Sequence, residues 1–108
     1  MNQETKLYQS VVTGIGASLP KKIVTNKDLT KIVDTTEEWI VERTGIQERR
    51  IASDNETTSS LGTEAAKIAL QDAQLKNTDI DLIILATATP DNTFPASATV
   101  IQSSLGID

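Results

Sequence analysis

The sequence predicts an α/β protein, and three observations support this prediction. Apolar residues run from Leu82 to Ala86 without a polar interruption, which is typical of a strand covered on both faces in a parallel sheet. Segments 36–44 and 61–75 carry helix signals: a capping pattern before the first and an apolar stripe in the second. In chain order the expected elements follow the pattern β-α-α-β-α-β-α, which indicates the α/β class.

The chain is expected to open with a strand and a short helix. β-Branched residues and glycines at positions 10–18 predict a strand that enters a turn at Pro20. Asn26 is the expected N-cap of a short helix, because the apolar residues after it have helical spacing. Those residues are Leu29, Ile32 and Val33.

The next helix has clearer boundaries. Thr35 and Glu38 match a capping box, in which each side chain bonds the backbone N–H of the other residue. Gly45 supplies a left-handed stop, so the helix is expected over 36–44. A short strand should follow over 47–51.

The second half is expected to contain a loop, a helix, a strand and a final helix. The polar residues 53–60 indicate the loop, and the alanine-rich helix 61–75 should approach its neighbours closely. The strand covers 80–88, and the last helix begins at Pro95 and stops at Gly106. Because a doubly covered strand needs layers on both faces, we expect the sheet to continue in sequence not included here.

Composition excludes several chemistries. The 108 residues contain no Cys and no His, which excludes disulfides, zinc–thiolate sites, Cys nucleophiles and Ser-His-Asp triads, and we expect no metal site. The net charge of -5 argues against nucleic-acid binding. No apolar run approaches the ~20 residues that span a bilayer, and Met1–Lys6 lacks the apolar stretch of a secretion signal. We therefore expect a cytoplasmic protein that binds neither nucleic acid nor membrane.

Thr35, Trp39 and Arg43 form the most specific candidate site. Positions i, i+4 and i+8 of one helix lie on one stripe. An indole stacks on a flat ring such as adenine, a guanidinium pairs with phosphate, and a helix N-terminus favours anions. The stripe could therefore hold a nucleotide-like ligand. The alternative is structural, with Trp39 as a packing anchor and Arg43 as the solvated partner of Glu38 or Glu42.

Gly14 and Gly16 suggest a dinucleotide-binding turn, but the pattern is incomplete. That fingerprint needs Gly or Ala three residues after the second glycine, where Leu19 stands. Pro20 also prevents a helix from starting there. A structural turn is the favoured interpretation.

Phe94, the only phenylalanine, lies in the loop after the predicted buried strand. Ligands of open α/β sheets bind at the carboxyl ends of strands, so Phe94 could close a pocket or cross a subunit interface. Alternatively, it fills the local core beneath the loop. The sequence leaves both interpretations open.

Several segments resemble β-ketoacyl-acyl-carrier-protein synthase III and occur in the same order as in that family. The most specific is Trp-Ile-x-x-Arg-Thr-Gly-Ile, which runs from Trp39 to Ile46. The resemblance covers nearly everything after about Val11. Its segments are 19–20, 24–26, 34–40, 43–51, 82–89, 94–96 and 101–106.

The resemblance implies the thiolase fold, which has two similar halves related by a pseudo-two-fold axis in α-β-α-β-α layers. Residues 1–108 would form most of the first half, as one incomplete domain. Residues 1–9 would be a polar leader or the start of the first strand.

The resemblance also implies an acyltransferase that begins type II fatty-acid synthesis. Such enzymes join an acyl-CoA starter, often acetyl-CoA, to malonyl-acyl-carrier protein with loss of CO2. Acyl-CoA is a substrate, so no cofactor is expected. The expected partners are acyl-CoA, malonyl-acyl-carrier protein and a second copy of the chain in a homodimer.

The same resemblance assigns roles to four residues. The residue matching Trp39 stacks on the CoA adenine, and those matching Thr35 and Arg43 contact the adenosine and its phosphates. The residue matching Phe94 lies at the dimer interface and lines the acyl pocket of the partner subunit, where its size limits the starter chain.

None of these residues is expected to be catalytic. The family's cysteine takes the acyl group, and its histidine and asparagine stabilise the enolate and oxyanion; all three would lie beyond Asp108. The 108 residues alone are therefore expected to be inactive. They would be part of a longer synthase III, a truncated module that binds CoA or partner chains, or a degraded sequence without a stable fold.

Overall fold

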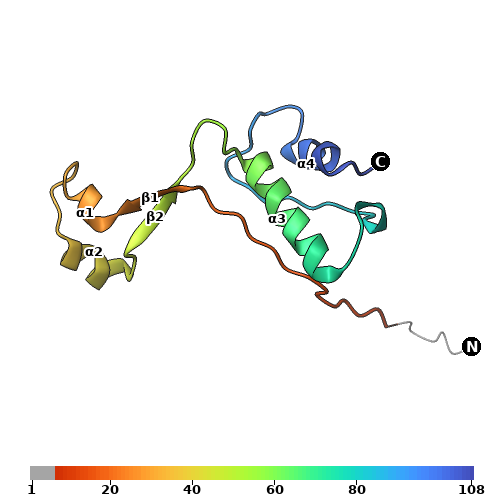
Figure 1. The fold of residues 1–108 in the computed structure, drawn as a ribbon, viewed down its shortest axis with the longest axis horizontal. Coiled ribbons are helices and arrows are strands. Elements are labelled where there is room, and N and C mark those ends of the chain that lie inside the picture. Colours follow the sequence, from red (N-terminus) through yellow and green to blue (C-terminus); the bar gives the residue numbers. More distant parts are fainter. Residues whose placement is uncertain (1–6) are drawn as a thin grey trace, which may run out of the picture.

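The computed structural model describes residues 7–108, which form two groups of elements joined by extended backbone (Figure 1). The first group contains the strands β1 and β2 and the helices α1 and α2, and the second contains the helices α3 and α4 (Figure 1). Residues 1–6 of the expected leader lie outside the described residues, and residues 7–9 have no regular secondary structure. The elements are β1 (Lys22–Thr25), α1 (Asn26–Leu29), α2 (Glu37–Thr44), β2 (Glu48–Ile51), α3 (Thr58–Ala73), the 3-10 turn η1 (Asn77–Asp79) and α4 (Ser97–Leu105).

The sheet of the described residues is a two-stranded antiparallel ribbon. Strand β1 pairs with β2 so that Lys22 lies opposite Ile51 and Thr25 lies opposite Glu48. The prediction of β2 is confirmed to within one residue. Strand β1 was missed, because the β-branched pattern at residues 10–18 drew the strand prediction to the wrong segment.

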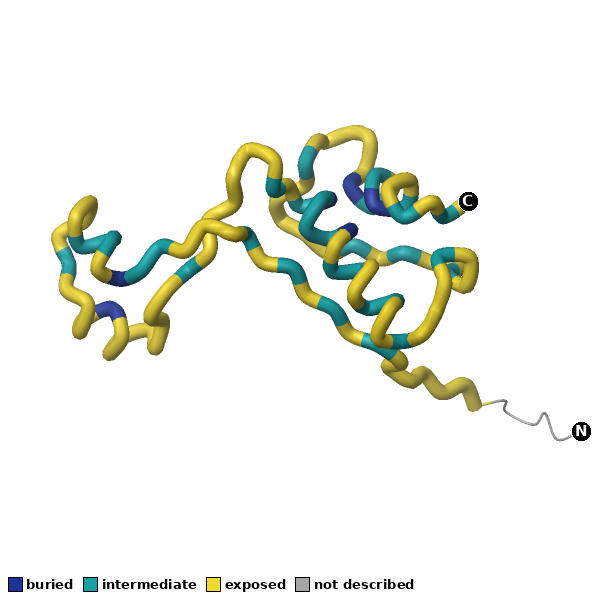
Figure 2. The backbone as a smooth tube through the Cα atoms, in the orientation of Figure 1, coloured by how far each residue is buried: buried dark blue, intermediate teal, exposed yellow. Residues whose placement is uncertain are grey.

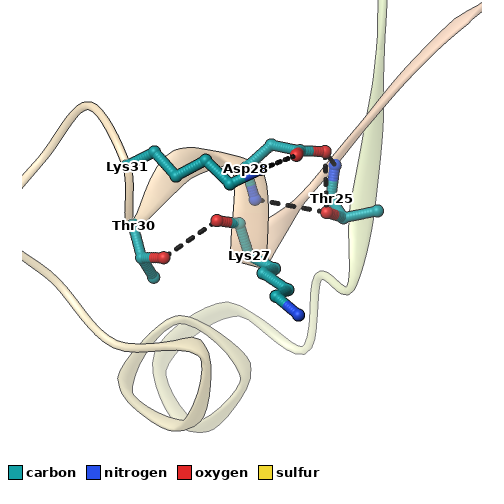
Figure 3. A network of polar contacts seen from close by, with 5 residues as sticks. All are labelled: Thr25, Lys27, Asp28, Thr30 and Lys31. Atoms are coloured by element: carbon teal, nitrogen blue, oxygen red, sulfur yellow. Dashed lines mark hydrogen bonds and ion pairs between the residues drawn. The ribbon is translucent and has the colours of Figure 1, made fainter.

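The N-cap of α1 is Thr25, one residue before the predicted Asn26 (Figure 3). The Thr25 hydroxyl accepts from the Asp28 backbone N–H, and the Asp28 carboxylate accepts from the backbone N–H and hydroxyl of Thr25. These bonds, the hydroxyl bond first, and the ammonium of Lys31 lower the pKa of Asp28 to about 2. The side chain of Asn26 is instead buried and donates to the carbonyl of Ile46, which ties α1 to the end of α2.

The boundaries of α2 differ by one residue from the prediction at its start and agree with it at its end. Thr36, rather than Thr35, is the N-cap, and its hydroxyl accepts from the backbone N–H of Trp39. Two adjacent threonines offer the same chemistry, and Thr36 is the one whose extended backbone directly precedes the first helical residue, with φ -124° and ψ 157°. Gly45 adopts the left-handed conformation with φ 69°, as predicted.

Helices α3 and α4 are displaced from their predicted starts. Helix α3 begins at Thr58, within the segment predicted as a loop, because Thr57 and Ser60 form a reciprocal capping box. Helix α4 begins at Ser97, two residues after Pro95. The left-handed stop at Gly106 is confirmed, with φ 65°.

Two segments predicted as strands are extended but unpaired. Residues 10–18 and 80–88 join no hydrogen-bonded ladder within the described part of the chain. The expected burial of the second segment is also wrong, since Leu82 is 75% exposed and Ile84 is 84% exposed. A strand covered on both faces needs neighbouring strands and layers, and residues 7–108 supply few of them.

Gly14 and Gly16 have a packing role rather than a phosphate-binding one. A Cβ at Gly16 would collide with the backbone oxygen of Ala65 and would lie 2.5 Å from the nitrogen of Ala69. A Cβ at Gly14 would likewise collide with Ala69. The extended segment therefore crosses the alanine-rich face of α3 at backbone-to-backbone distance, which only glycine permits.

The molecule is long and little of it is buried (Figure 2). Its principal extents are 69 × 34 × 29 Å, and its accessible surface is 9149 Å². A compact monomer of this mass exposes about 5,800 Å². Among the described residues the buried apolar side chains are Ile40 and Ile101. None of the helices described is long and apolar enough to span a bilayer.

Candidate functional site

Helix α2 presents an aromatic ring and a cation one turn apart. Trp39 is 55% exposed, and the Cζ atom of Arg43 lies 5.8 Å from the centroid of its ring. Within residues 7–108, Arg43 forms no ion pair with Glu38 or Glu42. The expected pairing of Arg43 with a glutamate is therefore not found among the described residues, and its guanidinium lies over the indole, at a cation–π distance.

Trp39 also borders a groove between α2 and the segment that precedes it. The groove has a volume of about 460 Å³, and most of its lining is apolar. Its lining residues are Leu29, Val33, Asp34, Thr35, Thr36, Trp39 and Ile40. A flat ring would fit such a groove with one face against the indole.

Thr35 brings an unused polar atom to the same groove. It precedes the N-cap, so it does not lie on the helical stripe that the sequence predicted. Its Oγ1 atom is buried, and among the described residues it has no hydrogen-bond partner. Buried hydroxyls are nearly always hydrogen-bonded, so this one is the polar atom beside the groove for which a partner is missing.

The chemistry of Thr35, Trp39 and Arg43 suits recognition rather than catalysis. The indole gives a stacking surface, the hydroxyl gives a donor and an acceptor, and the guanidinium gives charge for an anion. No three His, Cys, Asp or Glu side chains in the described part of the chain gather closely enough to hold a metal ion.

Phe94 lies away from this groove, in the loop before α4. That loop is beside α3, whereas α2 is at the other end of the molecule (Figure 1). Phe94 is 89% exposed. The interpretation of Phe94 as a local core residue is therefore wrong, and the structure does not bring it together with Trp39.

The sequence reasoning missed a polar cluster at the base of the Phe94 loop. The carboxylate of Asp91 accepts from the backbone N–H of Ser59 at 2.9 Å, from the hydroxyl of Thr57 at 3.1 Å and from the hydroxyl of Ser59. The bond from the Ser59 hydroxyl, followed by that from its backbone N–H, lowers the pKa of Asp91. The run of Thr and Ser at 57–60 signals this cluster, because the first N–H groups of a helix need an acceptor.

Curated proteins of similar sequence share one description. Over 101 residues, or 94% of its length, the chain is 58% identical to β-ketoacyl-[acyl-carrier-protein] synthase III of Brucella anthropi. It is 57% identical over 100 residues to the protein of the same description from Ehrlichia canis. The chain is homologous to synthase III. It spans about 31% of the length of these relatives, and no protein-family model matches it.

Solved structures of synthase III and related enzymes show the same fold. The 3-oxoacyl-[acyl-carrier-protein] synthase III of Aquifex aeolicus matches 89% of this chain with a TM-score of 0.85 and 52% identity, over 31% of its own length. The priming β-ketosynthase of the R1128 polyketide pathway matches 90% of the chain with a TM-score of 0.86 and 39% identity, over 29% of its length. The predicted α/β class and thiolase fold are therefore confirmed. The roles of Thr35, Trp39, Arg43 and Phe94 stay predictions.

Proposed function

We propose that this chain is the CoA-binding and subunit-contact segment of an initiating condensing enzyme of type II fatty-acid synthesis. The complete enzyme would join an acyl-CoA starter, often acetyl-CoA, to malonyl-acyl-carrier protein with loss of CO2. The observation that carries the proposal is the homology to synthase III over 94% of the chain. The proposal includes a cytoplasmic homodimer that uses acyl-CoA as a substrate and needs no cofactor.

The groove beside Trp39 supports a role in holding the adenosine end of CoA. Adenine is flat and apolar on its faces, so it would stack on the exposed indole within the groove. The unpaired hydroxyl of Thr35 would bond a nitrogen of the base or an oxygen of the ribose. Arg43, which has no carboxylate partner among the described residues, would face the phosphates.

Acyl transfer in this proposal needs groups that these 108 residues do not contain. The sequence has neither Cys nor His, so the nucleophile and the histidine that stabilises the enolate would come from other sequence. The segment contributes affinity and orientation for the starter. Phe94, exposed on its loop, would enter the partner subunit and limit the length of the acyl chain.

Fluorescence tests the CoA site directly. Trp39 is the only tryptophan in the sequence, so its emission reports on the groove without interference. CoA should quench this emission saturably. Pantetheine, which lacks both the adenosine and the phosphates of CoA, should quench it much less. Arg43→Ala should weaken CoA binding about tenfold, because charge-assisted hydrogen bonds to phosphate are worth about 1.5–3 kcal/mol.

The matched control is Lys31→Ala, which removes an exposed cation that pairs with Asp28 and does not line the groove. This variant should bind CoA like the parent chain. Equal responses to CoA and pantetheine would contradict the adenosine site. Binding of CoA by a natural protein that has no condensing activity would favour the alternative, a non-catalytic module.

A further inference from the structure

The loop over residues 89–97 is bonded to the start of α3 before Phe94 and is closed on itself after Phe94. Before Phe94, the hydroxyl of Thr58 donates to the carbonyl of Thr89 at 2.6 Å, and Asp91 accepts from Ser59. After Phe94, the hydroxyl of Ser97 accepts from the backbone N–H of Asp91 at 3.0 Å. Asp91 therefore bonds both the helix behind the loop and the residue that ends the loop.

Within the described part of one chain, the side chain of Phe94 makes few contacts that could fix its location. At 89% exposure it packs against almost nothing in the described part of the chain. Its position therefore depends on the backbone, which is fixed three residues before it by Asp91 and three residues after it by Ser97. Ser59 and Ser97 are both buried, so competing water has limited access to their bonds with Asp91.

We propose that Asp91 is a positioning residue for starter specificity: its carboxylate, bonded to Ser59, holds the backbone to which Ser97 is bonded and so sets where the loop presents Phe94. This inference rests on the proposed function of Phe94 as a limit on the acyl chain. Loss of the Asp91 carboxylate would leave the Phe94 side chain intact, but the loop would no longer hold the ring in one position. The limit on the length of the acyl chain would therefore relax. A displacement of about 1 Å in a group that positions the substrate is enough to change reaction rates severalfold or more.

A plain capping role for Asp91 predicts a different result. Asp91 bonds the backbone N–H of Ser59 near the start of α3, so its loss also weakens that helix. A helix cap that acts only on stability lowers the activity on all starters in proportion. A positioning residue changes the ratio between starters.

Steady-state kinetics of the complete gene product separate these roles. We would measure kcat/KM for acetyl-CoA and for a longer branched acyl-CoA in Asp91→Ala, Asp91→Asn and Phe94→Ala. We expect Asp91→Ala to raise the branched-to-acetyl ratio about fivefold to tenfold, in the direction set by Phe94→Ala. Asp91→Asn keeps an oxygen that accepts the Ser59 N–H, so it should restore most of the parent ratio.

The control is Asp28→Ala, which removes the carboxylate that caps α1 in the other group of elements. It should lower stability and leave the starter ratio unchanged. The proposal would be overturned if Phe94→Ala changes the branched-to-acetyl ratio of kcat/KM and Asp91→Ala does not. If Asp91→Ala does not fold, Ser97→Ala removes the second anchor without touching the α3 cap and decides by the same criterion.

A spectroscopic measurement separates failure of this inference from failure of the proposed function. Fluorine NMR of protein labelled with 4-fluorophenylalanine reports on Phe94, and Phe94→Leu identifies its signal. The signal should shift or broaden in Asp91→Ala and Ser97→Ala and stay in place in Asp28→Ala. If Phe94→Ala leaves the starter profile unchanged, the pocket role of Phe94 is wrong. If the Phe94 signal does not move in Asp91→Ala, the positioning role of Asp91 is wrong, whatever the role of Phe94.

Discussion

Trp39 shows how a single residue combines a structural position with a binding surface. Its backbone N–H is bonded by the cap residue Thr36, so the ring is carried by the first turn of α2. Trp39 nevertheless stays 55% exposed, and the guanidinium of Arg43 lies over its ring. An exposed aromatic ring next to an apolar groove and an unpaired hydroxyl is the arrangement expected of a binding site rather than of a core.

We predict that Trp39→Ala raises the KM of the complete enzyme for acyl-CoA about tenfold and lowers kcat much less. Stacking of a base on an aromatic side chain is worth about 1–3 kcal/mol, and this energy is the same in the ground state and the transition state. Trp39→Phe should retain most of the affinity. A fall in kcat at constant KM would contradict the stacking role.

The site could be predicted from the sequence only in part. Spacing alone placed Thr35, Trp39 and Arg43 on one helical stripe, which is right for Trp39 and Arg43. Thr35 reaches the same groove from outside the helix, because Thr36 takes the cap. The choice between adjacent threonines depends on local backbone geometry that composition does not encode. Asp91 was missed because its partners lie some thirty residues away in the chain.

At the scale of elements, residues 14–16 contact α3 so closely that a Cβ at either glycine would collide with the helix backbone. The sequence showed both halves of this contact, the glycines and the alanine-rich stripe of α3, but it did not show that they meet. Helix stops at Gly45 and Gly106 were predictable because a left-handed residue is a local requirement. Strand pairing was not, because a ladder depends on which segments become neighbours.

We predict that Gly16→Ala destabilises the protein by about 1–3 kcal/mol or more, because the added methyl has no space against the α3 backbone. The measurement is the free energy of unfolding in urea. Ala17→Ser, which adds one heavy atom at an exposed neighbouring position, is the matched control and should change that free energy little. Equal stability of the two variants would show that the segment does not pack on α3 this closely.

The carboxylates that cap α1 and α3 also make the free energy of unfolding depend on pH. The pKa of Asp28 falls from about 3.9 in an unfolded chain to about 2 in the fold. A depressed pKa means that the stabilising contribution is complete above about pH 4 and is lost as the pH falls toward about 2. We predict that the free energy of unfolding decreases over this window, and that Asp28→Asn makes the decrease shallower. A variant with an unchanged slope would contradict the role of this carboxylate.

At the scale of the molecule, the exposed surface is the dominant feature. The chain exposes 9149 Å², well above the value for a compact monomer of its mass. The uncovered apolar surface includes residues 80–88, in which Leu82 and Ile84 are mostly exposed. Apolar patches of this kind bind other surfaces or promote aggregation.

We predict that the chain of 108 residues, prepared alone, binds the dye ANS in native buffer and loses this signal in concentrated urea. The dye reports exposed apolar surface on a folded framework. Ile84→Ser should lower the signal without lowering stability, because Ile84 packs against little. Absence of dye binding would mean that this surface is covered, for example by a second copy of the chain.

The contact of the first extended segment with α3 has a consequence for synthesis. The backbone N–H of Ile15 donates to the carboxylate of Asp72, which follows it by 57 residues. At about 5–20 residues per second, a ribosome needs roughly 3–11 seconds to add that stretch. The segment around Ile15 therefore obtains this contact only after α3 has been made. During those seconds its β-branched residues are open to chaperones and to neighbouring nascent chains.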